Sequence, residues 1–399
     1  MERLQPIRSQ ERIEIIDIFR GFSLFGILLA NMLWFMYPVY LQSYFGSPNE
    51  FTASWTTLDH ILKTVVSMFI DGKFITLFSM LFGFGMIIMY ERASFRHQSF
   101  VPFYLRRLFL LLIFGLIHGY FIWFGDILAD YAVIGLFLLL FHRLKGTTLL
   151  VISYVLFGLY FSFSVLIQLG MYFLNEPLII PEKEFTAIHS TIAVHQQGSF
   201  VELMKANVAE RHYYFGSGGL GYLMHLLTLL PFSAAFFFGA GVAKKKWIQQ
   251  FKEKQKGFKV VGIITLLTGA FFSWIIPLVT PETPFNLLQY ASAPLLTIAY
   301  CVFLLFLFEH GNALHVLAAP GRMALTNYIF QSILFTFLYG PFAFGVYGKI
   351  SYSLALLFGV IFFIIQVIAS NWWLNRFRFG PLEWMWRSLT YMKKQPFKK

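Results

Sequence analysis

Ten long runs of apolar residues constrain this chain most strongly, because each is long enough to cross a lipid bilayer as a helix. The hydrocarbon core of a bilayer is about 30 Å thick and an α-helix rises about 1.5 Å per residue, so a span needs about 20 residues. Charged residues make up only 13% of the 399 residues, against roughly 25% in a soluble domain. The sequence therefore predicts an all-α fold, a polytopic membrane bundle that forms a single membrane domain over 1–399. The predicted spans are 18–38, 73–90, 104–124, 127–143, 148–173, 220–243, 259–279, 287–308, 323–344 and 351–373.

The distribution of charge predicts how the bundle sits in the membrane. With the N-terminus inside and ten alternating spans, 25 of the Lys and Arg residues fall on the inner side and 6 on the outer side. The acidic residues divide 8 to 11, so the inner side carries +17 and the outer side −5. Because basic residues favour the cytoplasmic side, we expect both termini in the cytoplasm. The net charge of +12 then indicates insertion and contact with anionic membrane lipids, and we expect no nucleic-acid partner.

Two segments between the spans are expected on the outer side. Residues 56–70 place apolar side chains on one stripe and polar side chains on the other, which is typical of an amphipathic helix at a membrane surface. The loop 174–219 is long, and its second half, FVELMKANVAERHYYF, has a helical period. We expect this loop to cap an outward-facing cavity.

The first span begins with ionisable residues, which are costly inside a membrane and are therefore functional candidates. Asp17 and Arg20 are three residues apart on one helix face, and Asn31 lies three turns further along that face. Arg20 is a candidate for holding a phosphate or carboxylate at the inner surface, and Asn31 for lining a path outward. The alternative is an ion pair at the helix end together with an interhelical hydrogen bond.

The third span carries Arg106 and Arg107 at its inner end and His118 in its outer half, followed by Asp126. A neutral histidine is a competent general base near pH 7, and a nearby carboxylate orients it and supports its protonated form. The glycines on either side of this histidine, in GLIHG, indicate close helix packing. The alternative is a histidine that is simply hydrogen-bonded within the bundle.

The ninth span begins with GRMALTNYIFQS, a segment rich in polar side chains. Arg322 adds a cation on the inner side, and Asn327 and Gln331 are four residues apart on one helix face. Gln366 and Ser370 repeat this spacing in the tenth span. Stripes of this kind either line a substrate path or join helices through hydrogen bonds, and the spacing alone does not choose between the two.

Metal chemistry has little support in the sequence. Cys301 is the sole cysteine, which excludes an internal disulfide and any site built from several cysteines. The histidines expected on the outer side lack the close spacing of metal ligands. We therefore predict no metal site.

Five segments carry a family resemblance, and together they cover nearly the whole chain in the right order. They are DIFRGF with GILLAN in the first span, DGKFITLFSMLFGFG at 71–85, RRL with GLIHGYFIWFGDILADYAVIG within 106–135, GRMALTNYIFQS at 321–332, and RFRFGPLEWMWRSLTY at 376–391. On these segments the chain resembles the YeiB-like family of bacterial membrane proteins, the domain of unknown function numbered four-one-eight. The resemblance implies a multi-pass protein of the bacterial cell (inner) membrane.

That family is similar, more distantly, to transmembrane acyltransferases of the acyltransferase-three and heparan-glucosaminide acetyltransferase types. These proteins move an acyl group from cytoplasmic acyl-CoA to a glycan or lipid outside. The acyltransferase-three pattern has an arginine followed eleven residues later by a histidine, whereas here Arg20 is followed by Asn31, whose amide cannot act as a base. The heparan type has a histidine beyond the first span, and His60, next to Asp59, lies at that rough position.

The resemblance and the polar residues together predict a membrane acyltransferase with acyl-CoA as its donor substrate. The acceptor is expected near His118 with Asp126, or near His60 with Asp59. Two alternatives stay open, a transporter or flippase for a lipid-linked or small anionic solute, and a non-catalytic membrane partner. A polar tunnel from the Arg20 side to His118 would favour acyl transfer. A wholly packed centre would favour the non-catalytic membrane partner. The arginines expected to meet the donor phosphates are Arg20, Arg106, Arg107 and Arg322.

Overall fold

The structure is a computed structural model that describes residues 13–37, 54–174, 182–214, 225–279 and 287–399. Within these ranges the regular structure is helical, and the only β pairing is an isolated bridge between Phe377 and Lys398. The predicted all-α fold class is therefore confirmed.

Each of the ten predicted spans contains a helix. Eight helices in the described ranges are long and apolar enough to cross a membrane, so the protein is a multi-pass membrane protein. Helix α12 counts among the eight through the longer stretch His225–Lys244, whereas α7 and α16, with 13 and 16 residues, are not among them, so their crossing stays a prediction. The predicted sixth span begins in residues outside the described ranges. The helices are α1 (Glu14–Met36), α5 (Lys73–Phe95), α6 (Phe100–Phe121), α7 (Leu128–Leu140), α8 (Gly146–Leu174), α12 (Leu230–Lys244), α13 (Gln255–Val279), α14 (Leu287–His310), α16 (Ala324–Tyr339) and α17 (Tyr352–Arg376).

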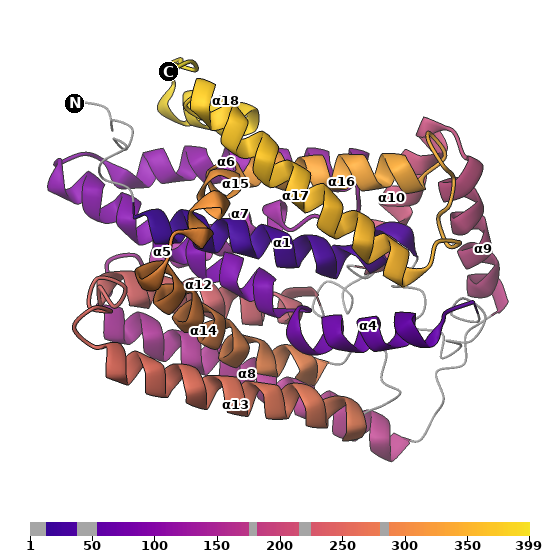
Figure 1. The fold of residues 1–399 in the computed structure, drawn as a ribbon, viewed down its shortest axis with the longest axis horizontal. Coiled ribbons are helices and arrows are strands. Elements are labelled where there is room, and N and C mark those ends of the chain that lie inside the picture. Colours follow the sequence, from indigo (N-terminus) through magenta and orange to yellow (C-terminus); the bar gives the residue numbers. More distant parts are fainter. Residues whose placement is uncertain (1–12, 38–53, 175–181, 215–224, 280–286) are drawn as a thin grey trace.

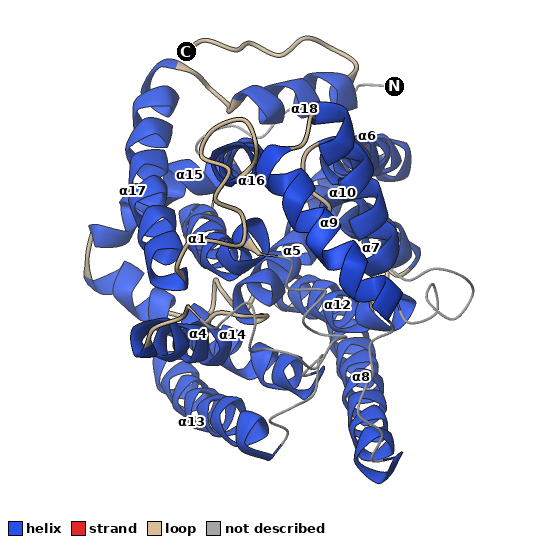
Figure 2. Ribbon diagram, turned by 90° about the vertical axis from the view of Figure 1, so that its right-hand side faces the viewer, coloured by secondary structure: helices blue, strands red, loops and turns tan. Residues whose placement is uncertain are grey.

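The long helices lie side by side, roughly along the horizontal axis of Figure 1. Helix α1 packs against α5, α16 and α17, while α12 lies against α5 and α8, and α6 pairs with α7. Helices α13 and α14 form a further pair at one side of the bundle. The view in Figure 2 shows α1 and α5 inside the bundle and α8, α13 and α17 toward its periphery. Little of α13 and α8 is buried, as expected for helices that face lipid.

The remaining helices lie at the two ends of the bundle. The predicted amphipathic helix is α4 (Thr57–Phe69), and the predicted cap loop contains two helices, α9 (Glu182–Gln197) and α10 (Phe200–Tyr214), of which the sequence indicated only the second. Helices α4 and α9 lie at the right in Figure 1, and α18 (Pro381–Tyr391) lies at the left with the start of α1. This arrangement agrees with the alternation of spans, and the assignment of the left end to the cytoplasm stays a prediction.

A short helical segment crosses the start of α1 at very close range. It consists of η2 (Ala313–Leu317) and α15 (Ala318–Arg322), and two glycines permit the crossing. A Cβ atom on Gly21 would lie 2.1 Å from the carbonyl oxygen of Leu317, and one on Gly321 would lie 1.8 Å from that of Asp17. The sequence placed Arg322 just before a continuous ninth span, whereas the chain breaks at Met323 before α16 begins.

Candidate functional site

A cavity of about 280 Å³ lies between α1, α5, α6, α7, α16 and α18. Among the described residues, six arginines and two carboxylates, Asp17 and Glu383, face this cavity, and the rest of its wall is largely apolar. Six arginines thus surround one end of a cavity whose interior is built from Leu, Ile and Phe side chains. Such an end suits a ligand with several negative charges. The six arginines are Arg20, Arg92, Arg96, Arg107, Arg322 and Arg387.

The structure brings three of the four predicted arginines to this cavity. Arg20 donates to Asp17 Oδ1 at 3.0 Å, as the spacing on α1 indicated. Arg107 lies over the indole ring of Trp386, with its Cζ atom 3.6 Å from the ring centroid. Arg106 lies elsewhere, because its exposed side chain donates to the carbonyl oxygen of Thr390 at 3.2 Å and does not line the cavity.

Helix α18 lines the arginine end of the cavity. The Glu383 carboxylate accepts from the Thr326 amide at 3.0 Å and from its hydroxyl at 2.6 Å. Burial raises the pKa of Glu383 above its ordinary value, against the effect of these two hydrogen bonds. Trp386 also donates to the carbonyl oxygen of Arg107 at 3.0 Å, which fixes α18 against α6. The sequence analysis gave this helix only as part of a segment that carries the family resemblance, so Arg387 and Glu383 were not predicted as site residues.

A buried histidine–aspartate pair lies beyond the other end of the cavity. His118 Nδ1 is 2.9 Å from Asp126 Oδ1, and both side chains are fully buried. Asp126 Oδ2 accepts from the Ala129 amide at 2.9 Å, which holds the carboxylate at the start of α7. A carboxylate on Nδ1 favours the tautomer in which Nε2 is an acceptor. In the described part of the chain His118 Nε2 is buried and has no hydrogen-bond partner.

The glycines around His118 make this contact possible. A Cβ atom on Gly115 would lie 2.3 Å from the Ala129 amide nitrogen and 2.8 Å from Asp126 Oδ2. A Cβ atom on Gly119 would lie 2.4 Å from Arg211 Nη1. The close packing expected from GLIHG is therefore confirmed.

The cap helix α10 holds the turn that carries Asp126. Asn207 donates from Nδ2 to the carbonyl oxygen of Ile122 at 3.3 Å, and Arg211 donates to that of Phe124 at 3.1 Å. These bonds connect α10 to two carbonyl groups in the first half of the turn between α6 and α7. Although the cap was predicted only in outline, it contacts the backbone beside the histidine–aspartate pair.

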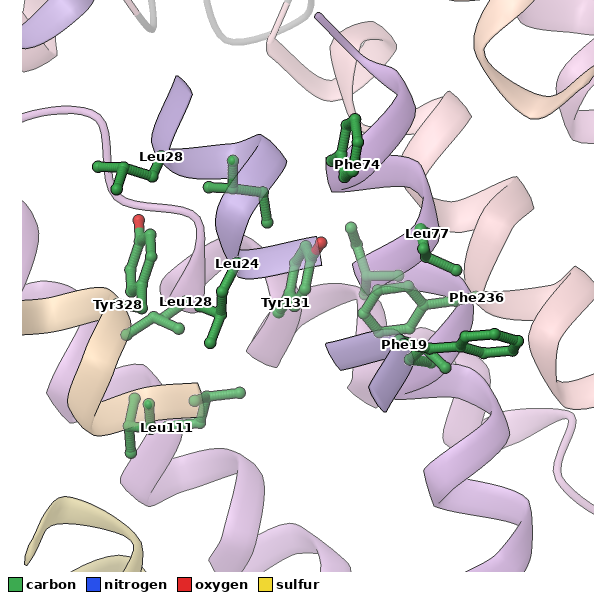
Figure 3. Packing of buried hydrophobic residues seen from close by; sticks show 14 of the residues in the cluster. Phe19, Leu24, Leu28, Phe74, Leu77, Leu111, Leu128, Tyr131, Phe236 and Tyr328 are labelled. Carbon is green, nitrogen blue, oxygen red and sulfur yellow. The ribbon is translucent and has the colours of Figure 1, made fainter. Parts of the chain in front are cut away.

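Tyr328 connects the cavity to the pair. Its side chain lines the cavity, and its ring centroid lies 5.1 Å from that of His118. Its hydroxyl donates to the carbonyl oxygen of Gly125 at 3.4 Å. Figure 3 shows Tyr328 beside Leu128, with Leu111 nearby, and these two leucines also line the cavity. The cavity thus ends one side chain away from His118, and His118 itself does not line it.

Asp59 and His60 lie in a different place, on α4. The Asp59 carboxylate forms a capping box with Thr56 and also accepts from the Ser353 amide at 2.7 Å. These contacts stabilise the start of α4 and attach it to the start of α17. His60 is exposed and lies against Trp55, with ring centroids 5.5 Å apart. The structure therefore does not form a histidine–carboxylate pair from these two residues.

The predicted substrate-path residues join helices. Asn327 donates to Ser370 Oγ at 3.0 Å, and Gln331 donates to Gln366 Oε1 at 2.8 Å. Gln366 in turn donates to the carbonyl oxygen of Asn327 at 3.1 Å. This network connects α16 to α17. The polar stripes therefore join helices through hydrogen bonds, which was one of the two alternatives that the spacing left open. Asn31 is half-buried and does not line the arginine cavity.

Metal ligands do not gather in the described ranges, where no group of three or more His, Cys, Asp or Glu side chains could hold an ion. Cys301 is a free thiol on α14. The described candidate site therefore consists of the arginine cavity, Tyr328 and the buried pair.

These features define a polytopic helical membrane protein with an arginine-lined cavity. A family model described as "Protein of unknown function (DUF418)" matches residues 242–393. The chain is 35% identical to the uncharacterized protein YxaH of Bacillus subtilis (strain 168), over 100% of this chain and 99% of that protein. It is 28% identical to the uncharacterized protein YeiB of Escherichia coli (strain K12), over 95% of this chain and 96% of YeiB. The chain therefore belongs to the YeiB-like DUF418 family, which confirms the resemblance. No solved structure matches it.

Proposed function

We propose that this protein is a membrane-bound acyltransferase that moves an acyl group from cytoplasmic acyl-CoA to a glycan or lipid acceptor outside a bacterial inner membrane. One observation carries the proposal. The cavity has arginines at one end, and at the other end Tyr328 lies against a buried His118–Asp126 pair. The charged end and the base thus lie on opposite sides of one cavity, as transfer across a membrane requires.

The arginine end supports binding of the donor phosphates. Guanidinium groups form bidentate hydrogen bonds with phosphate oxygens, and six arginines line this cavity in the described part of the chain. The positive-inside distribution favours the cytoplasmic side for this end, where acyl-CoA is made. The apolar interior of the cavity suits a short acyl chain and the part of acyl-CoA that is less polar than its phosphates.

The buried pair supports general-base catalysis. His118 Nε2 takes the proton of the acceptor hydroxyl as its oxygen attacks the thioester carbonyl, while Asp126 stabilises the imidazolium through Nδ1–H. The carbon–sulfur bond then breaks, and the coenzyme A thiolate takes the proton from His118. The products are the acylated acceptor and free coenzyme A, and no further reactant is needed. For this step Tyr328 must move, because it lies between the cavity and His118.

A transporter for a small anionic solute is the second candidate, because the same arginine cavity suits any small anion. That function needs no general base. It predicts uptake of the anion into vesicles and no release of free coenzyme A.

The test uses the purified full-length protein in liposomes with radiolabelled acetyl-CoA. We expect acetyl transfer by the wild type and loss of transfer in His118→Ala. His142→Ala is the matched control, because this histidine is also buried but is bonded to a backbone carbonyl outside the site. Full transfer by His118→Ala would remove His118 from the mechanism. Anion uptake without transfer by the wild type would favour the transporter.

A further inference from the structure

A second cavity, of about 480 Å³, lies between the α13–α14 pair and the helices α5 and α12. Its wall is almost entirely apolar and includes Met80, Val242, Val261, Cys301 and Val302. A polar ligand would lose its hydrogen bonds to water in such a cavity without replacing them. The ligand must therefore be largely hydrocarbon.

The polar residues of this cavity lie at one end only. Gln250 and Lys254 line it beside Trp247, all in the segment that joins α12 to α13. Lys254 donates to Gln250 Oε1 at 2.8 Å, and its side chain is exposed. The segment 244–259 holds seven lysines and a single acidic residue, and the charge distribution assigns it to the cytoplasmic side. Lysines near an inner leaflet attract anionic headgroups.

The cavity is also accessible from the lipid. Helix α13, which forms its outer wall, is the least buried of the candidate spans. A Cβ atom on Gly257, at the lysine end, would meet no atom within 4 Å. A chain can therefore enter sideways from the bilayer while its headgroup stays at the membrane surface.

We propose that this cavity binds an acyl chain of an anionic inner-leaflet phospholipid, with the phosphate held by the lysines of 244–259. The apolar wall selects the hydrocarbon chain, and the lysines select the negative headgroup. This site does not depend on the acyltransferase proposal.

Bound lipid would also act on the arginine cavity. Leu81 and Phe84 of α5 line both cavities, so these two side chains form a shared wall. A chain on one side restricts their rotamers on the other side. Lipid binding is therefore expected to change the shape of the arginine cavity.

The first test measures lipid binding to the purified full-length protein by native mass spectrometry. The probe is phosphatidylglycerol, and the comparison is phosphatidylcholine with the same chains. We expect the wild type to retain phosphatidylglycerol preferentially. Lys254→Gln with Lys256→Gln should weaken its binding about tenfold or more, because each lysine contributes to headgroup attraction. The matched control is Lys393→Gln with Lys394→Gln, two exposed lysines that follow α18 and do not line this cavity, which should bind like the wild type.

The second test fills the cavity. Cys301→Trp should abolish preferential retention, whereas Leu267→Trp on the exposed face of α13 should preserve it. If Cys301→Trp does not fold, the lysine variants decide alone. Equal retention of the two lipids, or unchanged retention in the lysine variant, would overturn the proposal. Complete displacement of phosphatidylglycerol by inorganic phosphate would overturn the role of the cavity, since only the headgroup would then be held.

Discussion

His118 Nδ1 lies 2.9 Å from Asp126 Oδ1, a contact that joins the end of α6 to the start of α7 inside the protein. The same carboxylate accepts from the Ala129 amide, so the turn and the imidazole ring are fixed together. A carboxylate at Nδ1 favours the tautomer in which Nε2 is the acceptor nitrogen.

Asp126→Asn should lower acyl transfer by about 10²-fold to 10⁴-fold, the usual contribution of an oriented general base. The amide can still accept from the Ala129 amide but no longer stabilises an imidazolium. The measurement is the initial rate with radiolabelled acetyl-CoA. Asp130→Asn is the control, because that carboxylate lies 3.3 Å from His225 and outside the pair. Equal loss in both variants would argue against a specific role for Asp126.

Gly115→Ala should destabilise the protein by about 1–3 kcal/mol, the usual effect of overpacking. The new Cβ atom would meet the Ala129 amide nitrogen at 2.3 Å, so α6 and α7 must separate. The readout is the melting temperature in detergent together with transfer activity. Gly158→Ala is the matched control, since a Cβ atom there meets nothing within 4 Å, and its melting temperature should not fall. Equal melting temperatures in the two variants would contradict the close packing.

Arg322→Gln should raise the KM for acyl-CoA about tenfold to 100-fold and change kcat less. Loss of a charge-assisted hydrogen bond weakens binding by about 1.5–3 kcal/mol. Arg106→Gln is the comparison, because Arg106 is exposed and does not line the cavity. The sequence assigned both arginines to the donor, and the structure separates them. A KM change in Arg106→Gln alone would contradict the cavity as the donor site.

Glu383 should make the folded state less stable as pH rises. Burial raises its pKa in the folded protein above the ordinary 4.5, so the folded state holds this proton more tightly than the unfolded chain. The Glu383 contribution to stability is therefore fully present below pH 4.5 and is lost as pH rises through the raised value. The melting temperature of the wild type minus that of Glu383→Gln should fall across this window. A difference that grows with pH would show instead that the neighbouring arginines stabilise the carboxylate.

The spans and the pairing of Asp17 with Arg20 were predictable, because both depend on local spacing. Apolar length identifies a membrane helix, and residues three apart share a helix face. His118 and Asp126 were also singled out, since only a turn separates them in the chain. In each case the contact forms within a helix or across a single turn.

The rest of the site depends on contacts between distant segments. Glu383 and Trp386 reach the cavity from the C-terminal helix, more than 250 residues from Arg107, and no spacing in the sequence relates them. Arg106 and Arg107 are neighbours, so composition could not show that only one faces the cavity. The break before α16 comes directly after Gly321, whose close contact with α1 is a tertiary contact that no local spacing indicates.

The most direct test of the central claim is an experimentally determined structure of the full-length protein with bound acetyl-CoA. The account predicts phosphate groups within hydrogen-bonding distance of Arg20 and Arg322 and the thioester beside Tyr328, with this ring displaced so that His118 is reached. Acetyl-CoA bound outside this cavity would contradict the account. So would a protein that transfers acetyl groups while Tyr328 is unchanged and still separates the thioester from His118.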